Sequence, residues 1–313
     1  MESAAGDDFL RNSGITLKAK SPCADKRPSG GDAHSAAAWS ALAFSAPADL
    51  KAPDTGTWYW LPRIPPPESV KPNTIFLFQG DSITDGGRRR DGDPNHAMGD
   101  SYAFSVASYL GEKHAALRPA FLNRGNSGDT SAQVRARWQA DALDLHPDVI
   151  SLLVGVNDLL VHCADGVSEE TAQATSPAAY EDNLRAMLSE ARSRNPSVQL
   201  LLGLPFFYRI DGFDPSVHWN DDAMTRGFTM DFRNAVTQRN VMQRVAYIPQ
   251  LQAVVRRVAA DFGAVLLDYP AAIDNAMKTA PIEYWVWDGI HVTCAGQRLL
   301  MRTWLDGYRT LQP

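Results

Sequence analysis

The sequence contains little cysteine and none of the common metal-binding motifs. Its three cysteines in 313 residues, Cys23, Cys163 and Cys294, are too few and too widely spaced to predict a disulfide framework or a zinc site. No HExxH or CxxC motif occurs. The stretch 91–102 begins like a calcium loop, but it has a histidine in place of the turn glycine and a tyrosine in place of the bidentate glutamate. We therefore expect chemistry without a metal ion or other cofactor.

Long hydrophobic runs and an excess of basic residues are also missing. No apolar run reaches the roughly 18 residues of a membrane-spanning helix. The chain has 30 Lys and Arg against 36 Asp and Glu residues, a formal net charge of −6, which indicates no basic surface for nucleic acid. The one tight basic run, Arg88–Arg90, lies between Asp85 and Asp91 and is expected to form a solvated loop. Neither a membrane nor a nucleic acid is an expected partner, and homo-oligomerisation is left open.

Residues 1–70 are rich in Ala, Ser, Gly and Pro, unlike the rest of the chain. We expect a low-complexity N-terminal extension that docks in part on one domain formed by residues 71–313. The segment 57–63, which contains three large aromatic residues, is the part expected to be held in place. The first ten residues carry acidic rather than basic side chains, which argues against an ordinary signal peptide and favours a cytoplasmic location over secretion.

From residue 74 onward, apolar segments alternate with amphipathic ones. The predicted strands are 74–79, 119–125, 147–158, 197–206 and 264–269. The predicted helices are 101–113, 131–145, 178–194, 242–263 and 294–308. Strands without a polar face are buried on both sides, and interleaved helices cover a parallel sheet. The pattern therefore predicts an α/β fold, a three-layer α/β/α sandwich with a parallel sheet of about five strands.

Ligands bind such a sheet at the carboxyl ends of its strands. The loops expected there carry a serine (Ser82), a glycine-rich turn (125–130), an asparagine (Asn157) and an aspartate–histidine pair (Asp288 and His291). Alone, Ser82 fits a helix N-cap as well as a nucleophile. Together the four loops supply what a serine hydrolase needs, because the hydroxyl needs a base, the base an orienting acid and the oxyanion its donors.

The stretches GDSIT, NSGDT, GVND and DGIH resemble, in order and spacing, the blocks of the SGNH hydrolases, the GDSL esterase/lipase superfamily. The resemblance covers about residues 74–307 and implies the flavodoxin-like fold of that family. It implies Ser82 as nucleophile, His291 as general base and Asp288 as its orienting acid. The implied oxyanion donors are the N–H groups of Ser82 and Gly128 and the side chain of Asn157.

The nearest resemblance within the superfamily is to the acetylxylan and related carbohydrate acetyl esterases. Aromatic residues near the expected site fit this class, because aromatic faces stack on sugar rings. Asp81, beside the nucleophile, is assigned to holding its loop and is grouped with the substrate contacts rather than with the catalytic residues. The predicted substrate contacts are Asp81, Phe206, Tyr208, Trp285 and Trp287.

These features predict a metal-independent serine esterase that removes a short acyl group, acetyl in the first instance, from an acetylated oligosaccharide or other small ester. Three alternatives stay open. The same machinery could act on a lysophospholipid, a thioester or short-chain esters in general. The loop after the first strand could instead cradle a phosphate or flavin in a non-catalytic binding module. The chain could also be a catalytically silent family member.

Overall fold

A computed structural model of the chain describes residues 70–210 and 240–311. Within these residues, five parallel strands form one sheet in the order β2-β1-β3-β4-β5. The predicted α/β class and the five-stranded parallel sheet are confirmed. The predicted extension over residues 1–70 lies outside the described residues, apart from Val70. The strands are β1 (Ile75–Gly80), β2 (Ala120–Asn123), β3 (Val149–Leu153), β4 (Gln199–Gly203) and β5 (Val265–Leu267).

The central strand β3 is buried along its whole length. It pairs in register with β1 on one side, where Phe76 lies opposite Val149, and with β4 on the other, where Leu200 lies opposite Ile150. A strand that is apolar on both faces requires a layer of helices above and below the sheet.

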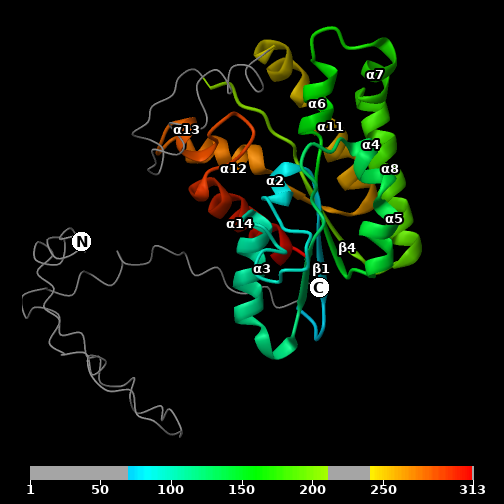
Figure 1. Ribbon diagram of the computed structural model, residues 1–313, viewed down its shortest axis with the longest axis vertical. Helices are drawn as coiled ribbons and strands as arrows, with labels where there is room; N and C mark the ends of the chain where they lie inside the picture. The colour runs from blue at the N-terminus through cyan, green and yellow to red at the C-terminus, as the bar shows by residue number, and fades with distance from the viewer. Residues whose placement is uncertain (1–69, 211–239, 312–313) are drawn as a thin grey trace, which may run out of the picture. The chain divides into compact units, whose positions relative to one another are not determined.

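Helices cover both faces of the sheet, as predicted for a three-layer sandwich (Figure 1). One face carries α3 (Tyr102–Lys113), α12 (Tyr269–Ala276) and α14 (Cys294–Arg309), and the other carries α4 (Ser131–Ala136), α8 (Pro177–Arg194) and α11 (Val241–Phe262). Side chains cap several of these helices: Ser101, Ser176 and Thr293 each accept a backbone N–H of the first turn. In the described part of the chain, no helix has the length and apolarity to cross a bilayer.

The prediction of one helix over residues 131–145 is wrong. The segment is divided into α4, α5 (Trp138–Asp141) and the 3-10 turn η4 (Leu143–Leu145). The first break falls at Arg137, whose backbone (φ −106°, ψ 7°) leaves the helical region. Its guanidinium bonds Asp129, Asp141 and the carbonyl of Arg124.

Short helical segments were not predicted at all, because few of them are long enough to show a hydrophobic period. Most of them lie between the predicted elements, but α6 begins inside the predicted strand 147–158, which ends as β3 at Leu153. They are α2 (Ser82–Asp85), the 3-10 turn η3 (Ala115–Leu117), α6 (Val156–His162), α7 (Glu169–Ala174), α12 and α13 (Ile282–Trp285).

A cluster of aromatic rings joins β1 to α14 in the core. Phe78 lies 5.6 Å and Tyr308 5.1 Å from the Trp304 ring, measured between centroids. The indole N–H of Trp304 donates to the Ser151 hydroxyl of β3 at 3.0 Å, in a fully buried position. This bond removes the cost of burying a polar donor inside an apolar layer.

The Ser151→Ala variant is therefore expected to lose about 1–3 kcal/mol in free energy of unfolding, because it leaves the buried indole N–H without a partner. Urea-induced unfolding of the full chain measures this loss. Trp304→Phe should cost less in the Ser151→Ala background than in the wild type, because the orphaned donor is then gone. Strict additivity of the two changes would contradict this interpretation.

Candidate active site

The predicted site residues meet at the carboxyl ends of β1 and β3. These adjacent parallel strands mark the point where the strand order in the sheet reverses. Ser82 begins α2 immediately after β1, and Asn157 lies in the first turn of α6 after β3. Asp288 and His291 reach the same edge from the loop between α13 and α14. Segments more than 200 residues apart in sequence thus form one site.

Ser82, His291 and Asp288 form a continuous chain of hydrogen bonds. The Ser82 Oγ lies 2.8 Å from His291 Nε2, and His291 Nδ1 lies 2.6 Å from Asp288 Oδ2. The second carboxylate oxygen of Asp288 accepts the backbone N–H groups of Ile290 at 2.9 Å and His291 at 2.6 Å. Because Asp288 accepts at Nδ1, the Nε2 lone pair of a neutral imidazole faces the serine hydroxyl.

The loop that carries Asp288 and His291 is held from two sides. Val286 and Val292 form an antiparallel bridge, and the Trp287 N–H donates to the His291 carbonyl at 3.0 Å. From the segment after β4, the Tyr208 N–H donates to the Gly289 carbonyl at 2.8 Å. The three-residue spacing of acid and base therefore fits a closed turn rather than a mobile loop.

The charges around the imidazole favour its protonated form. Burial lowers the pKa of His291, but the hydrogen bond and negative charge of Asp288, with a smaller contribution from Asp81, raise it above its ordinary value overall. Burial raises the pKa of the Asp81 carboxyl to about 7, against the opposing effect of its hydrogen bond from Ile83. Asp81 thus adds negative charge beside His291 only above about that pH.

The short helix α2 presents Ser82 to the site. Asp81, not Ser82, is its N-cap and accepts the Ile83 N–H at 3.1 Å. Ser82 occupies the first helical position, and within the described residues its own N–H donates to no backbone carbonyl outside the helix. Before α2, Gly80 has φ +156°, and a Cβ there would lie 2.1 Å from the Leu153 carbonyl oxygen. Glycine therefore allows β1 to stay paired with β3 up to the serine.

The other two predicted oxyanion donors lie beside this helix turn. Gly128 has φ +88° and is exposed, and its N–H makes no backbone hydrogen bond in the parts of the chain that the structure describes. The Asn157 amide donates one hydrogen to the Asp129 carbonyl at 3.0 Å, which fixes its orientation and leaves the other hydrogen for a ligand. The geometry thus provides a serine, a base, an orienting acid and candidate donors at one sheet edge.

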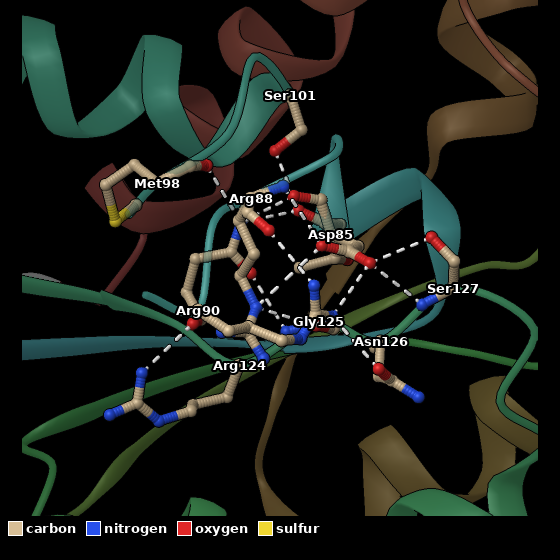
Figure 2. A network of polar contacts seen from close by, with 12 residues as sticks. Asp85, Arg88, Arg90, Met98, Ser101, Arg124, Gly125, Asn126 and Ser127 are labelled. Atoms are coloured by element: carbon tan, nitrogen blue, oxygen red, sulfur yellow. Dashed lines mark hydrogen bonds and ion pairs between the residues drawn. The ribbon is translucent and has the colours of Figure 1, made fainter. Parts of the chain in front are cut away.

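A buried carboxylate connects α2, the helix that begins at Ser82, to the loop that carries Gly128. Asp85, the last residue of α2, accepts both the N–H and the hydroxyl of Ser127 at 3.0 and 2.8 Å (Figure 2). Asn123 also connects α2 to this loop. Its amide N–H donates to the Thr84 carbonyl at 2.7 Å, and its side-chain oxygen accepts the Gly125 N–H at 2.9 Å. The part of Asp85 and Asn123 in joining α2 to this loop was not predicted from the sequence. The position of Asp85, three residues after Ser82, could have indicated that it lies near the site.

The expectation that Arg88–Arg90 forms a solvated loop is wrong for Arg88, whereas Arg89 and Arg90 are exposed. Arg88 is largely buried and donates to the Gly125 carbonyl at 2.8 Å. Arg90 bonds the Asp85 carboxylate at 3.0 Å and the Asn126 side-chain oxygen at 2.9 Å (Figure 2). A buried carboxylate needs a charged or hydrogen-bonding partner, and these arginines supply it.

A cleft of about 320 Å³ opens beside the serine and the histidine. Its lining includes no Lys or Arg from the described part of the chain. Among residues 70–210 and 240–311, no three His, Cys, Asp or Glu side chains are grouped as metal ligands. The polar and aromatic side chains that line the cleft are Ser82, Asp100, Ser127, Trp287, His291 and Gln297.

The predicted substrate contacts divide into three groups. Trp287 lines the cleft, and its ring is stacked 6.2 Å from the imidazole of His291. Tyr208 and Trp285 are half-buried and bonded within the protein, to Asp274 and to the Ala280 carbonyl respectively.

Asp81 and Phe206, each 1% exposed, have no surface left for a ligand, so their prediction as substrate contacts is corrected. Asp81 instead caps α2, which agrees with its expected part in holding the loop. Residues 211–239, which follow this segment after β4, lie outside the described residues.

Comparisons with known proteins identify the family of this chain. Residues 78–299 match the GDSL-like Lipase/Acylhydrolase family. The chain is 30% identical over 233 residues to an acetylxylan esterase of Geobacillus stearothermophilus, a match that covers 74% of this chain and 91% of the relative. Among solved structures, Axe2, an acetylxylan esterase of G. stearothermophilus, matches with a TM-score of 0.58 at 26% identity, over 76% of this chain and 95% of Axe2. LAE5, an alpha/beta hydrolase enzyme from the Lake Arreo metagenome, matches with a TM-score of 0.60 at 24% identity, over 78% and 99% of the two chains, and supports the fold.

Ser127→Ala is expected to lower kcat for 4-nitrophenyl acetate about tenfold with little change in KM, because it removes one of the bonds that hold the Gly128 loop to α2. Ser197→Ala is the matched control, since the Ser197 hydroxyl bonds the neighbouring Asn195 on an exposed turn. Equal kcat values for the two variants would show that the Asp85–Ser127 contact does not position the loop.

Proposed function

This chain belongs to the GDSL-like lipase/acylhydrolase family and is a carboxylic ester hydrolase, and on that premise we propose that it removes acetyl groups from carbohydrates through an acyl-enzyme formed on Ser82. The observation that carries the proposal is the hydrogen-bond chain from Ser82 through His291 to Asp288. It is the arrangement that a serine nucleophile requires, and it lies at the ligand-binding edge of the sheet.

In the proposed reaction, the Ser82 Oγ attacks the ester carbonyl carbon while His291 Nε2 takes its proton. The tetrahedral intermediate then breaks its bond to the sugar oxygen, which leaves as an alcohol with the proton from His291. Water, deprotonated by the same imidazole, attacks the acetyl-serine and releases acetate. Asp288 holds the imidazole in the required tautomer and stabilises its positive charge.

The negative oxygen of each intermediate is assigned to the N–H groups of Ser82 and Gly128 and to the Asn157 amide. Support comes from the Ser82 position in the first helical turn, the lack of a backbone partner for the Gly128 N–H among described residues, and the orientation of Asn157 by Asp129. Removal of one such donor in other hydrolases costs roughly 3–4 kcal/mol of barrier. The catalytic roles of all five residues are part of the proposal.

The carbohydrate substrate is proposed from the relatives and from the cleft. Both the 30% identical relative and Axe2 are acetylxylan esterases. The cleft combines an indole face, Trp287, with polar side chains, a combination suited to a sugar ring. Its described lining offers no cation for a phosphate group, which argues against a lysophospholipid or an acyl-CoA.

The protein is expected to release acetate from acetylated xylo-oligosaccharides and to hydrolyse 4-nitrophenyl acetate faster than the octanoate ester. Acetate release is measured by a coupled assay across acetylated oligosaccharides, lysophospholipid and acyl-CoA. Ser82→Ala should abolish turnover of every ester. Faster octanoate turnover, or undiminished activity of Ser82→Ala, would contradict the proposal.

The pH dependence of kcat/KM should have its acid limb above pH 6.5, because His291 must be neutral to act as a base and its pKa is raised. Activity therefore rises as the pH increases through that pKa. Asp288→Asn should lower kcat by about 10²–10⁴-fold and move the acid limb to lower pH, since the partner that raises the pKa is lost.

Asp93→Asn is the matched control for this pH profile. Asp93 and His96 also form a carboxylate–imidazole pair with a three-residue spacing and a 2.6 Å distance, but on the surface. This variant should keep both kcat and the wild-type profile. An acid limb that does not move in Asp288→Asn would overturn the assignment of His291 as the titrating base.

A further inference from the structure

The cleft beside Ser82 contains a carboxylate that the proposed reaction does not use. Asp100 is exposed and lines the same cleft as Ser82 and His291. Its side chain has no hydrogen-bond or ion-pair partner within the described parts of the chain. An unpaired carboxylate is acceptor-only and binds hydroxyl donors strongly.

The backbone of Asp100 is fixed relative to the serine. Its N–H donates to the Gly86 carbonyl at 2.9 Å, and Gly86 is the C-cap of α2. A Cβ on Gly86 would lie 2.6 Å from the Ser101 backbone nitrogen, so the two segments are in close contact. Four helical residues span about 6 Å. Gly86 therefore lies about one helical turn from Ser82, and Asp100 is anchored to Gly86 on the lining of the same cleft.

Gln297 adds a second polar group to this cleft. It lies in the first turn of α14, just after the loop that carries His291, and lines the cleft. Its Oε1 is buried without a hydrogen-bond partner in the described residues. A buried acceptor without a partner is costly, and a small rotation of the amide would let a ligand hydroxyl satisfy it.

We propose that Asp100 and Gln297 bind hydroxyl groups of the sugar that leaves as the alcohol, and that Asp100 selects uncharged alcohols over anionic ones. This inference rests on the proposed carbohydrate esterase function. An alcohol bound in the cleft lies next to His291, the group that returns its proton. The Asp100 charge, unopposed by Lys or Arg in the described lining, disfavours a carboxylate or phosphate at the same place.

The test compares kcat/KM for acetylated xylobiose with kcat/KM for 4-nitrophenyl acetate in the full-length protein. Asp100→Asn should lower the ratio of the two values about tenfold, mostly through KM for the sugar ester, because a charge-assisted bond becomes a neutral one. Gln297→Leu should lower the ratio about three- to tenfold. Asp91→Asn, an exposed carboxylate in the same loop that does not line the cleft, should leave the ratio at the wild-type value.

A second measurement tests charge selection alone. 4-Acetoxybenzoate is an acetyl ester of an anionic alcohol, and Asp100→Asn should raise its kcat/KM relative to 4-nitrophenyl acetate about threefold at low salt. Added salt should shrink this difference by screening. The measurement does not depend on sugar turnover.

The outcomes separate the two proposals. If wild-type protein releases no acetate from any acetylated sugar, the proposed function fails. If wild-type protein releases acetate but the Asp100→Asn ratio stays within twofold of the wild-type ratio, the inference on Asp100 is overturned while the function stands. An unchanged preference between 4-acetoxybenzoate and 4-nitrophenyl acetate would overturn the charge selection.

Discussion

The hydrogen bond between the Ser82 hydroxyl and the His291 imidazole is the contact on which the site depends. It is 2.8 Å long and joins residues 209 positions apart. No single helix, strand or turn can bring together two residues so far apart in the sequence. The sheet does so by placing the turn after β1 beside β3, while the aromatic cluster around Trp304 packs α14 against the sheet, and the loop before α14 carries His291. Packing of the core thus sets the geometry of a single polar contact at its edge.

The fold could be predicted because its signals are local. The run from Val149 to Leu153 is apolar at nearly every position, which occurs when a strand is covered on both faces. The meeting of Ser82, Asp288 and His291 at one edge of the sheet could be predicted because each follows such a strand or precedes a clear helix, and their chemistry is complementary. The proposed roles of Gly128 and Asn157 rest on short motifs that resemble blocks of the SGNH family.

The features of the fold and site that were not predicted depend on tertiary contacts, which no local sequence pattern encodes. Arg137 lies at the break in the predicted helix, and its guanidinium bonds two carboxylates and two carbonyls, including that of Gly80 on β1. Arg88 was expected in a solvated loop, yet its side chain is largely buried and donates to the Gly125 carbonyl. Phe206 follows a strand, as an exposed site residue would, but its side chain lies in the core. In each case, the environment of the side chain was set by a segment distant in sequence.

The hydrogen bond from the Asp100 N–H to the Gly86 carbonyl joins the two ends of the loop formed by residues 87–99. Both ends of this loop are fixed, one by α2, which begins at Ser82, and the other by α3. Within this loop, Arg88 and Arg90 are bonded to Asp85 and to the Gly125–Asn126 turn, so residues 91–95 at its tip are the part whose length and composition can vary without disturbing Ser82. Evolution can therefore remodel the tip of one tethered loop while the contact between Ser82 and His291 stays constant.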